Sequence, residues 1–172
     1  MSKRDLKLYV HDLNKEQLQE QIVDLYTRFK DVKEYYDFAF NPKENKLIEE
    51  YKFKISKEYF PHTKRKAKCR RSVAQECIRH FKRLGVEPSL ILDIMLFNIE
   101  IAQTYSSEKD IIKDTFSKSM LKSFEEAINY TVENGLSNDF MLRFEKITDE
   151  SSNQNWFNYN YFERLLNTLH AE

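Results

Sequence analysis

Glycine and proline are so scarce in this chain that they constrain its fold more than any other feature. Its 172 residues include only two glycines, Gly85 and Gly135, and three prolines. A sheet-rich chain needs many tight turns, which favour glycine and proline, whereas the interiors of long helices exclude both. The sequence therefore predicts an all-α protein, either a compact multi-helix bundle or a short helical solenoid, with about seven to nine helices.

Short signals place several helix ends. Asn14 with Gln17 three positions later is a capping-box pattern and predicts a helix start, whereas Gly85 is typical of a helix end. Asn41 followed by Pro42 predicts another start, because proline favours the first helical position. The helix before Gly85 carries an apolar stripe at steps of four, four and three, made by Val73, Cys77, Phe81 and Leu84.

The helix that opens at Pro88 is unusually apolar. A helix that is apolar on most sides occupies the centre of a bundle, so we expect the core there. Ser106 or Ser107 predicts the start of the following helix, and the pattern also admits a break near Ser117. The last two helices are expected at about 137–147 and 156–169, with a polar connector between them.

Length and composition favour one soluble domain over residues 1–172. A single domain commonly has ~100–200 residues, and 41% of the chain is hydrophobic. The first residues contain no apolar stretch of the signal-peptide type, and no segment approaches the ~20 apolar residues of a membrane span. We therefore expect a cytoplasmic protein with no membrane contact. If Cys69 and Cys77 lie on one helix, they are too far apart to form a disulfide.

Charge is distributed very unevenly along the chain. The segment from Lys54 to Val86 holds 11 basic and two acidic residues, a net charge of +9, although the whole chain is neutral. A basic run that forms a loop or the start of a helix occupies residues 62–71. Such a localised positive field attracts phosphates or an acidic partner. The candidate phosphate- or partner-binding residues are Lys64, Arg65, Lys66, Lys68, Arg70, Arg71, Arg79, Lys82 and Arg83.

Two interpretations of this basic segment remain open. As a nucleic-acid site, its lysines and arginines would neutralise backbone phosphates, and the neighbouring Tyr59 and Phe60 could stack on bases. Alternatively, the cations are solvated or pair with acids elsewhere. The part of the chain after Val86 holds 15 acidic and seven basic residues, which offers many such partners.

Catalytic, cofactor and metal signatures are absent from the sequence. Glu76 and His80 lack the second histidine of a metalloprotease motif, and no close cysteine pair has zinc-ligand spacing. Asp93 and Glu100 lie seven residues apart on one helix face. We expect them on a wetted edge, or paired with arginines of the basic segment. No catalytic residue, cofactor site or metal site is predicted, and an enzyme with an unfamiliar site is a remote third alternative.

The leading functional hypothesis is a non-enzymatic protein-interaction or scaffold module, self-association included. The alternative is a nucleic-acid-binding module that uses residues 64–83. The aromatic run from Trp156 to Phe162 is expected to close the core rather than to form a docking face.

Two stretches of the chain carry a family resemblance. They run from Asn14 to Pro61 and from Arg70 to Ser106, and together they cover about half of the residues. Their overall pattern resembles an uncharacterised family of small bacterial proteins known as a domain of unknown function. The resemblance implies a cytosolic, largely helical protein of bacterial type. It implies no activity and no cofactor, and it assigns no functional residue.

Overall fold

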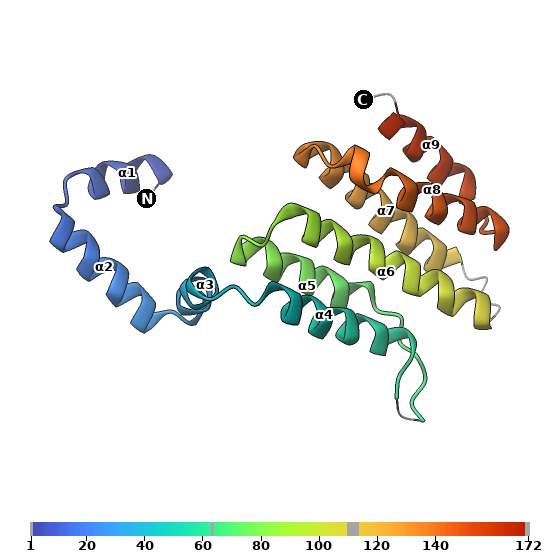
Figure 1. Ribbon diagram of the computed structural model, residues 1–172, viewed down its shortest axis with the longest axis horizontal. Coiled ribbons are helices and arrows are strands. Elements are labelled where there is room, and N and C mark those ends of the chain that lie inside the picture. The colour runs from blue at the N-terminus through green and yellow to red at the C-terminus, as the bar shows by residue number, and fades with distance from the viewer. Residues whose placement is uncertain (1, 63, 110–113, 171–172) are drawn as a thin grey trace. The chain divides into compact units, whose positions relative to one another are not determined.

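The computed structural model describes residues 2–62, 64–109 and 114–170, and every regular element among them is an α-helix. The all-α prediction is confirmed, because the described residues contain no strand. Figure 1 shows the helices in chain order. They are α1 (Lys3–His11), α2 (Lys15–Arg28), α3 (Lys30–Phe40), α4 (Glu44–Tyr59), α5 (Arg71–Leu84), α6 (Pro88–Lys109), α7 (Asp114–Asn134), α8 (Ser137–Asn153) and α9 (Tyr159–His170).

The chain divides into two compact units, Met1–Lys43 and Glu44–Glu172. We call them the N-terminal unit and the core unit. The single domain expected over residues 1–172 stays a prediction.

The N-terminal unit comprises α1, α2 and α3, and α2 packs against α3. The predicted capping box at the start of α2 is confirmed. Gln17 donates its backbone N–H to Asn14 Oδ1 at 2.8 Å, and Asn14 donates its own to Gln17 Oε1 at 3.0 Å. None of the described residues in these three helices is buried.

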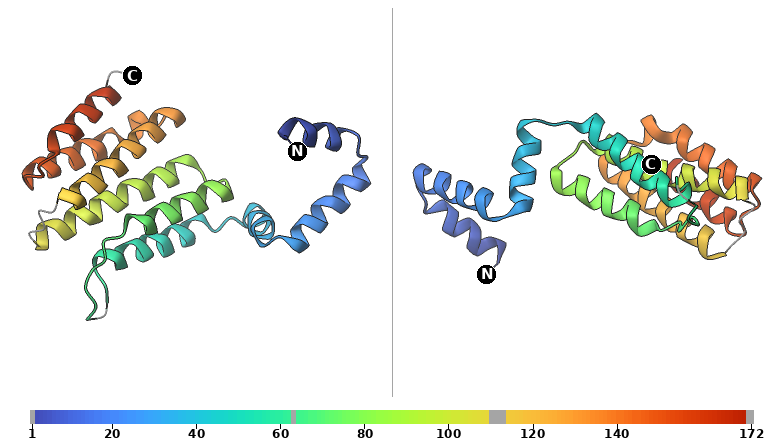
Figure 2. Two further views of the ribbon diagram at one scale, coloured as in Figure 1. Left: turned by 180° about the vertical axis from the view of Figure 1, so that it is seen from behind. Right: turned by 90° about the horizontal axis from the view of Figure 1, so that it is seen from below.

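The core unit is built around α6, as the apolar sequence of that helix predicted. This helix contacts α4, α5, α7 and α8, and α9 packs on α7 and α8. Figures 1 and 2 show the helices of this unit running alongside one another. Phe124 on α7 is fully buried between Phe144 and Phe162, with ring centroids 5.4 and 4.9 Å away. Trp156 and Phe162 are buried in this core, while Phe157 and Tyr161 of the same aromatic run are exposed.

Several predicted boundaries are wrong. Asn41 ends α3 and α4 begins at Glu44, so Asn41-Pro42 lies before that helix instead of opening it. Ser106 is buried within α6, which continues to Lys109. The helix that follows is described from Asp114, and it is unbroken at Ser117. Near the end of the chain, α8 extends to Asn153 and α9 begins only at Tyr159.

Tertiary hydrogen bonds explain the longer α8. The Ser151 hydroxyl donates to the Ile147 carbonyl at 2.8 Å and is buried. Gln103 on α6 donates its side-chain amide to that same carbonyl at 2.7 Å and to Ser151 Oγ at 3.1 Å. Polar residues that predict a connector therefore continue the helix here, because a neighbouring helix satisfies them.

Asp93 and Glu100 share one face of α6, but their partner is not in the basic segment. Arg143 on α8 donates to Glu100 through two nitrogens at 2.8 Å, and to Asp93 Oδ1 at 2.7 Å. Lys52 on α4 lies 2.7 Å from the other Asp93 oxygen. Burial raises the pKa of Asp93, but the hydrogen bonds from Lys52 and Arg143 outweigh it and hold the pKa below its usual value. This cluster joins α4, α6 and α8.

Candidate phosphate-binding loop

The α4–α5 loop, residues 60–70, projects from the core unit and carries most of the basic run. Glu58 on α4 anchors its far end. The Glu58 carbonyl accepts the backbone N–H groups of Lys68 and Cys69, both at 3.0 Å. Cys69 adopts a positive φ of 51°, an uncommon conformation for a residue other than glycine. The loop therefore turns back beside α4 before α5 begins.

Arg70 completes this anchor. Its guanidinium donates to both Glu58 carboxylate oxygens at 2.8 Å, in the forked geometry that arginine forms with carboxylates. The hydrogen bonds from Arg70 hold the pKa of Glu58 below its usual value, in spite of partial burial. Arg70 therefore shapes the loop, and its charge is offset by a carboxylate.

Basic side chains surround two hollows on this loop. The first is about 310 Å³ and is lined by Lys57, Glu58, Pro61, His62, Arg65, Lys66, Lys68 and Arg70. The second is about 690 Å³ and is lined by Tyr59, Phe60, Pro61, His62, Arg65, Lys66, Ala67, Tyr105 and Lys109. Arg65 and Lys66 border both hollows. Lys64, Arg65 and Lys66 are exposed, and among the described residues they form no ion pair.

Aromatic rings stand among these cations. Phe60 meets Tyr105 of α6 edge to face, with centroids 5.6 Å apart. Phe53 lies 5.4 Å from the His62 ring, and the Lys57 ammonium is 4.0 Å from the Phe53 centroid. Burial is the main reason that the pKa of Tyr105 is raised above its usual value.

Of the two aromatic residues predicted to stack on bases, only Phe60 is accessible. Tyr59 is 1% exposed, and its hydroxyl donates to Asn98 at 3.2 Å inside the core. The prediction for Tyr59 is therefore wrong, because that side of α4 faces α6. Tyr105 was missed, since it lies 45 residues along the chain from Phe60 and carries no local signal. Lys57 and Phe53 could have been found from their positions one turn apart on α4.

The remaining predicted basic residues lie elsewhere. Arg71 on α5 donates to Ser123 at 2.9 Å and to Glu126, both on α7. The ammonium of Lys82 is 4.3 Å from the Tyr130 ring. Arg79 and Lys82 border a third hollow with the acids Glu126 and Glu133. Arg83 is exposed near the end of α5.

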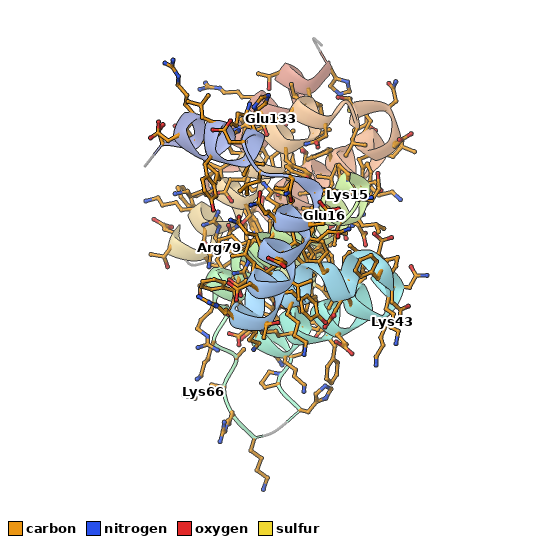
Figure 3. The ribbon with its side chains drawn as sticks, turned by 90° about the vertical axis from the view of Figure 1, so that its left-hand side faces the viewer. Lys15, Glu16, Lys43, Lys66, Arg79 and Glu133 are labelled. Carbon is orange, nitrogen blue, oxygen red and sulfur yellow. The ribbon has the colours of Figure 1, made fainter. Side chains whose placement is uncertain are left out.

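Figure 3 labels Lys66 on the loop and shows it well separated from Arg79 and Glu133. Helix geometry agrees, since Arg79 is eight residues along α5 from Arg71, or roughly 12 Å. The structure therefore brings Arg65, Lys66 and Lys68 together around the first hollow, and Lys64 lines neither hollow. It pairs Arg70 and Arg71 with acids, and it leaves Arg79, Lys82 and Arg83 towards the other end of α5.

A further hollow of about 570 Å³ lies between α6 and α8. Glu100 borders it, but this carboxylate is already held by Arg143. Within the described residues, no group of three or more histidine, cysteine or acidic side chains is arranged to hold a metal ion. Over the same residues, no helix has both the length and the apolar composition needed to cross a membrane. Cys69 and Cys77 are not in a disulfide.

Together, these features define a helical protein with a projecting cationic loop. The chain belongs to a family of unknown function, DUF6155, whose model matches residues 1–170. The match spans both units, and it confirms the resemblance to an uncharacterised family. No curated protein and no solved structure matches the chain.

Proposed function

We propose that the protein is a non-catalytic binding module and that its α4–α5 loop binds the phosphate backbone of nucleic acid. The observation that carries this proposal is the gathering of exposed cations around two hollows. Lys57, Arg65, Lys66 and Lys68 border the first hollow, and Glu58, the one acid among its described lining residues, is engaged by Arg70. Cations grouped in this way neutralise several phosphates at once and release their counterions.

Binding should be tested with fluorescent single-stranded and duplex oligonucleotides over a series of salt concentrations. The key variant is Lys64→Gln, Arg65→Gln, Lys66→Gln, which removes three charges from the loop. We expect wild-type affinity to fall steeply with salt, and the variant to reduce the slope of log affinity against log salt by about 2 for a single strand. Equal binding by wild type and variant would contradict the proposal.

The matched control removes three charges from the far end of α5, by Arg79→Gln, Lys82→Gln, Arg83→Gln. This change alters the net charge by the same amount but leaves the loop intact. We expect most of the affinity and the salt slope to remain. An equal loss in both variants would favour the broader surface over residues 64–83 that the sequence indicates.

A protein-interaction role is the second candidate, and the N-terminal unit favours it. Its exposed large apolar residues are Leu6, Leu8, Tyr9, Val10, Ile22, Val23, Leu25, Phe29, Tyr35 and Phe40. Leu18, Ile22, Leu25 and Phe29 follow the 4-3-4 spacing of helices that pair. Apolar surface gathered in this way is characteristic of an interaction site.

The occupant that we propose for this face is a second copy of the chain. The unit carries eight basic and eight acidic residues, so two copies meet without net repulsion, and one face can serve both subunits of a two-fold dimer. Light scattering should give the mass of a dimer for the wild type. The mass of a monomer should result from Ile22→Lys, Leu25→Lys, with Thr27→Lys, Glu20→Lys as the control on another side of α2. A monomeric wild type would exclude self-association.

A further inference from the structure

We infer that the larger hollow beside the α4–α5 loop receives an unstacked nucleobase, so that the loop binds single strands in preference to duplex. This inference rests on the proposed nucleic-acid function and adds the class of ligand to it. It depends on how aromatic and cationic side chains are distributed between the two hollows.

The two hollows differ in chemistry although they share Arg65 and Lys66. Among its described lining residues the smaller hollow has Lys57, Lys68 and Arg70, and its one aromatic ring, His62, also borders the larger hollow. The larger hollow adds Phe60 and Tyr105 to its border, with Lys109 at the end of α6. One side of the loop therefore suits phosphates alone, and the other side suits a phosphate with its attached base.

Phe60 and Tyr105 are placed to support a flat ligand. Their rings meet edge to face, an arrangement that covers one ring face of the pair, and both side chains are partly exposed. Tyr59 and Tyr105 also approach, with centroids 6.0 Å apart, and the buried Tyr59 holds Tyr105 from the core side. The Tyr105 ring is thus supported from the core side by a buried ring, and Phe60 packs on Tyr105 in turn.

Electrostatics in the larger hollow agree with this ligand. Among its described lining residues there is no acid, whereas Arg65, Lys66 and Lys109 are basic. The Tyr105 hydroxyl is neutral at physiological pH, as for any tyrosine with a pKa of about 10 or above, so the ring adds no negative charge. A base can stack on an aromatic face in any sequence, because every base has a π-face, while the adjoining phosphates contact the cations.

Duplex DNA cannot use the larger hollow in this way, because its bases remain stacked and paired. A single strand exposes its bases, and stacking of one base on an aromatic side chain is worth roughly tenfold in affinity. The phosphate contacts on the smaller hollow are available to both forms. We therefore expect both forms to bind and single strands to bind more tightly.

The test compares three probes of about 12 nucleotides, a length within the site sizes of single-strand binders. They are a mixed-sequence single strand, the same strand with abasic positions, and the matching duplex. We expect the ordinary strand to bind roughly tenfold more tightly than the abasic strand, which has the same backbone charge. Equal affinity of these two strands for the wild-type protein would overturn the inference.

Variants then locate the effect. Phe60→Leu and Tyr105→Leu should each remove the preference for the ordinary strand and leave abasic-strand affinity and salt slope unchanged. Tyr105→Phe should retain the preference, because the ring remains. A preference that survives both leucine substitutions in folded protein would overturn the assignment to this hollow.

The same experiment separates the inference from the function on which it rests. If the loop variant abolishes binding while ordinary and abasic strands bind equally, the phosphate site stands and the base site fails. If no probe binds the wild type at low salt, both fail.

Discussion

The N-terminal unit and the core unit are equally helical, but they are stabilised differently. In the N-terminal unit, α1 and α2 each begin with a full capping box, and no described residue of α1–α3 is buried. In the core unit, α5 and α8 begin without a side-chain cap, yet five residues of α5 and four of α8 are buried. In α1 and α2 good caps thus accompany poor burial, and in α5 and α8 good burial accompanies missing caps, whereas α3 has neither a side-chain cap nor a buried residue.

This contrast separates two sources of helix stability. A cap stabilises a helix end by about 1 kcal/mol and acts within a few residues. Burial of one large apolar side chain contributes about 1.5–3 kcal/mol and requires another helix. Short helices are marginal in water without such packing. The local order of the N-terminal unit thus depends on its caps and on whatever covers its apolar face. In the core unit, the helices bury one another's apolar side chains.

The largest expected difference is in amide hydrogen exchange. Amides in the middle of α6 should exchange only through global unfolding, while those of α1–α3 should exchange through local opening. We expect protection of α6 to exceed that of α1–α3 by at least roughly 10³-fold. Exchange followed by mass spectrometry at low protein concentration measures this ratio. Equal protection in both units would support the single cooperative domain expected over residues 1–172 and would remove the contrast.

The second largest expected difference is in the free energy of unfolding lost when one phenylalanine is removed from each unit. Phe124→Ala empties a fully buried position that packs on two other rings, so it should cost about 3–5 kcal/mol. Phe29→Ala changes a side chain that is 53% exposed and should cost less than about 1 kcal/mol. Urea denaturation of both variants tests this pair. A comparable cost for Phe29→Ala in a monomer would mean that the apolar face of α2 is covered within the chain.

Two arginines provide a comparison of ion pairs. Arg143→Ala leaves Asp93 and Glu100 without their shared partner in a partly buried setting, and should cost about 2 kcal/mol. Arg28→Ala removes an exposed pair on α2, in which Nε lies 2.7 Å from Asp24, and should cost less than about 0.5 kcal/mol. Thermal and urea unfolding give both values. The Arg143 cluster does not act as described if Arg143→Ala is as mild as Arg28→Ala.

The smallest expected effect is a pH dependence of the core unit. The folded-state pKa of Asp93 lies below its unfolded value, which is about 3.9. Its ionised form therefore stabilises the fold above pH ~3.9, and this contribution disappears as the pH falls through the folded-state pKa. Lys52, Arg143 and Glu100 surround it. Urea midpoints measured over a pH series should fall less steeply at acid pH for Asp93→Asn than for the wild type. An unchanged dependence on pH would assign the effect to Glu58 or another acid.

The sequence by itself determined the features that depend on neighbouring residues. The all-α class follows from the scarcity of glycine and proline, and the capping box at Asn14 and the helix end at Gly85 were both predicted correctly. The central position of the Pro88 helix was also predicted, because a helix apolar on most sides has no stable place at the surface. Each of these sequence patterns depends on residues close together in the chain or on the apolar surface of a single helix.

Tertiary structure alone decided which residues meet. Arg143 rather than the basic segment binds Asp93 and Glu100, and Tyr105 joins Phe60 beside the loop. The nine predicted cations do not gather at one site. The length of α5 keeps the cations at its two ends apart, and acids on α4 and α7 pair with Arg70 and Arg71. These outcomes depend on how each helix is rotated and where it crosses its neighbours. Such angles arise from the packing of side chains far apart in the chain, so the pattern of neighbouring residues does not predict them.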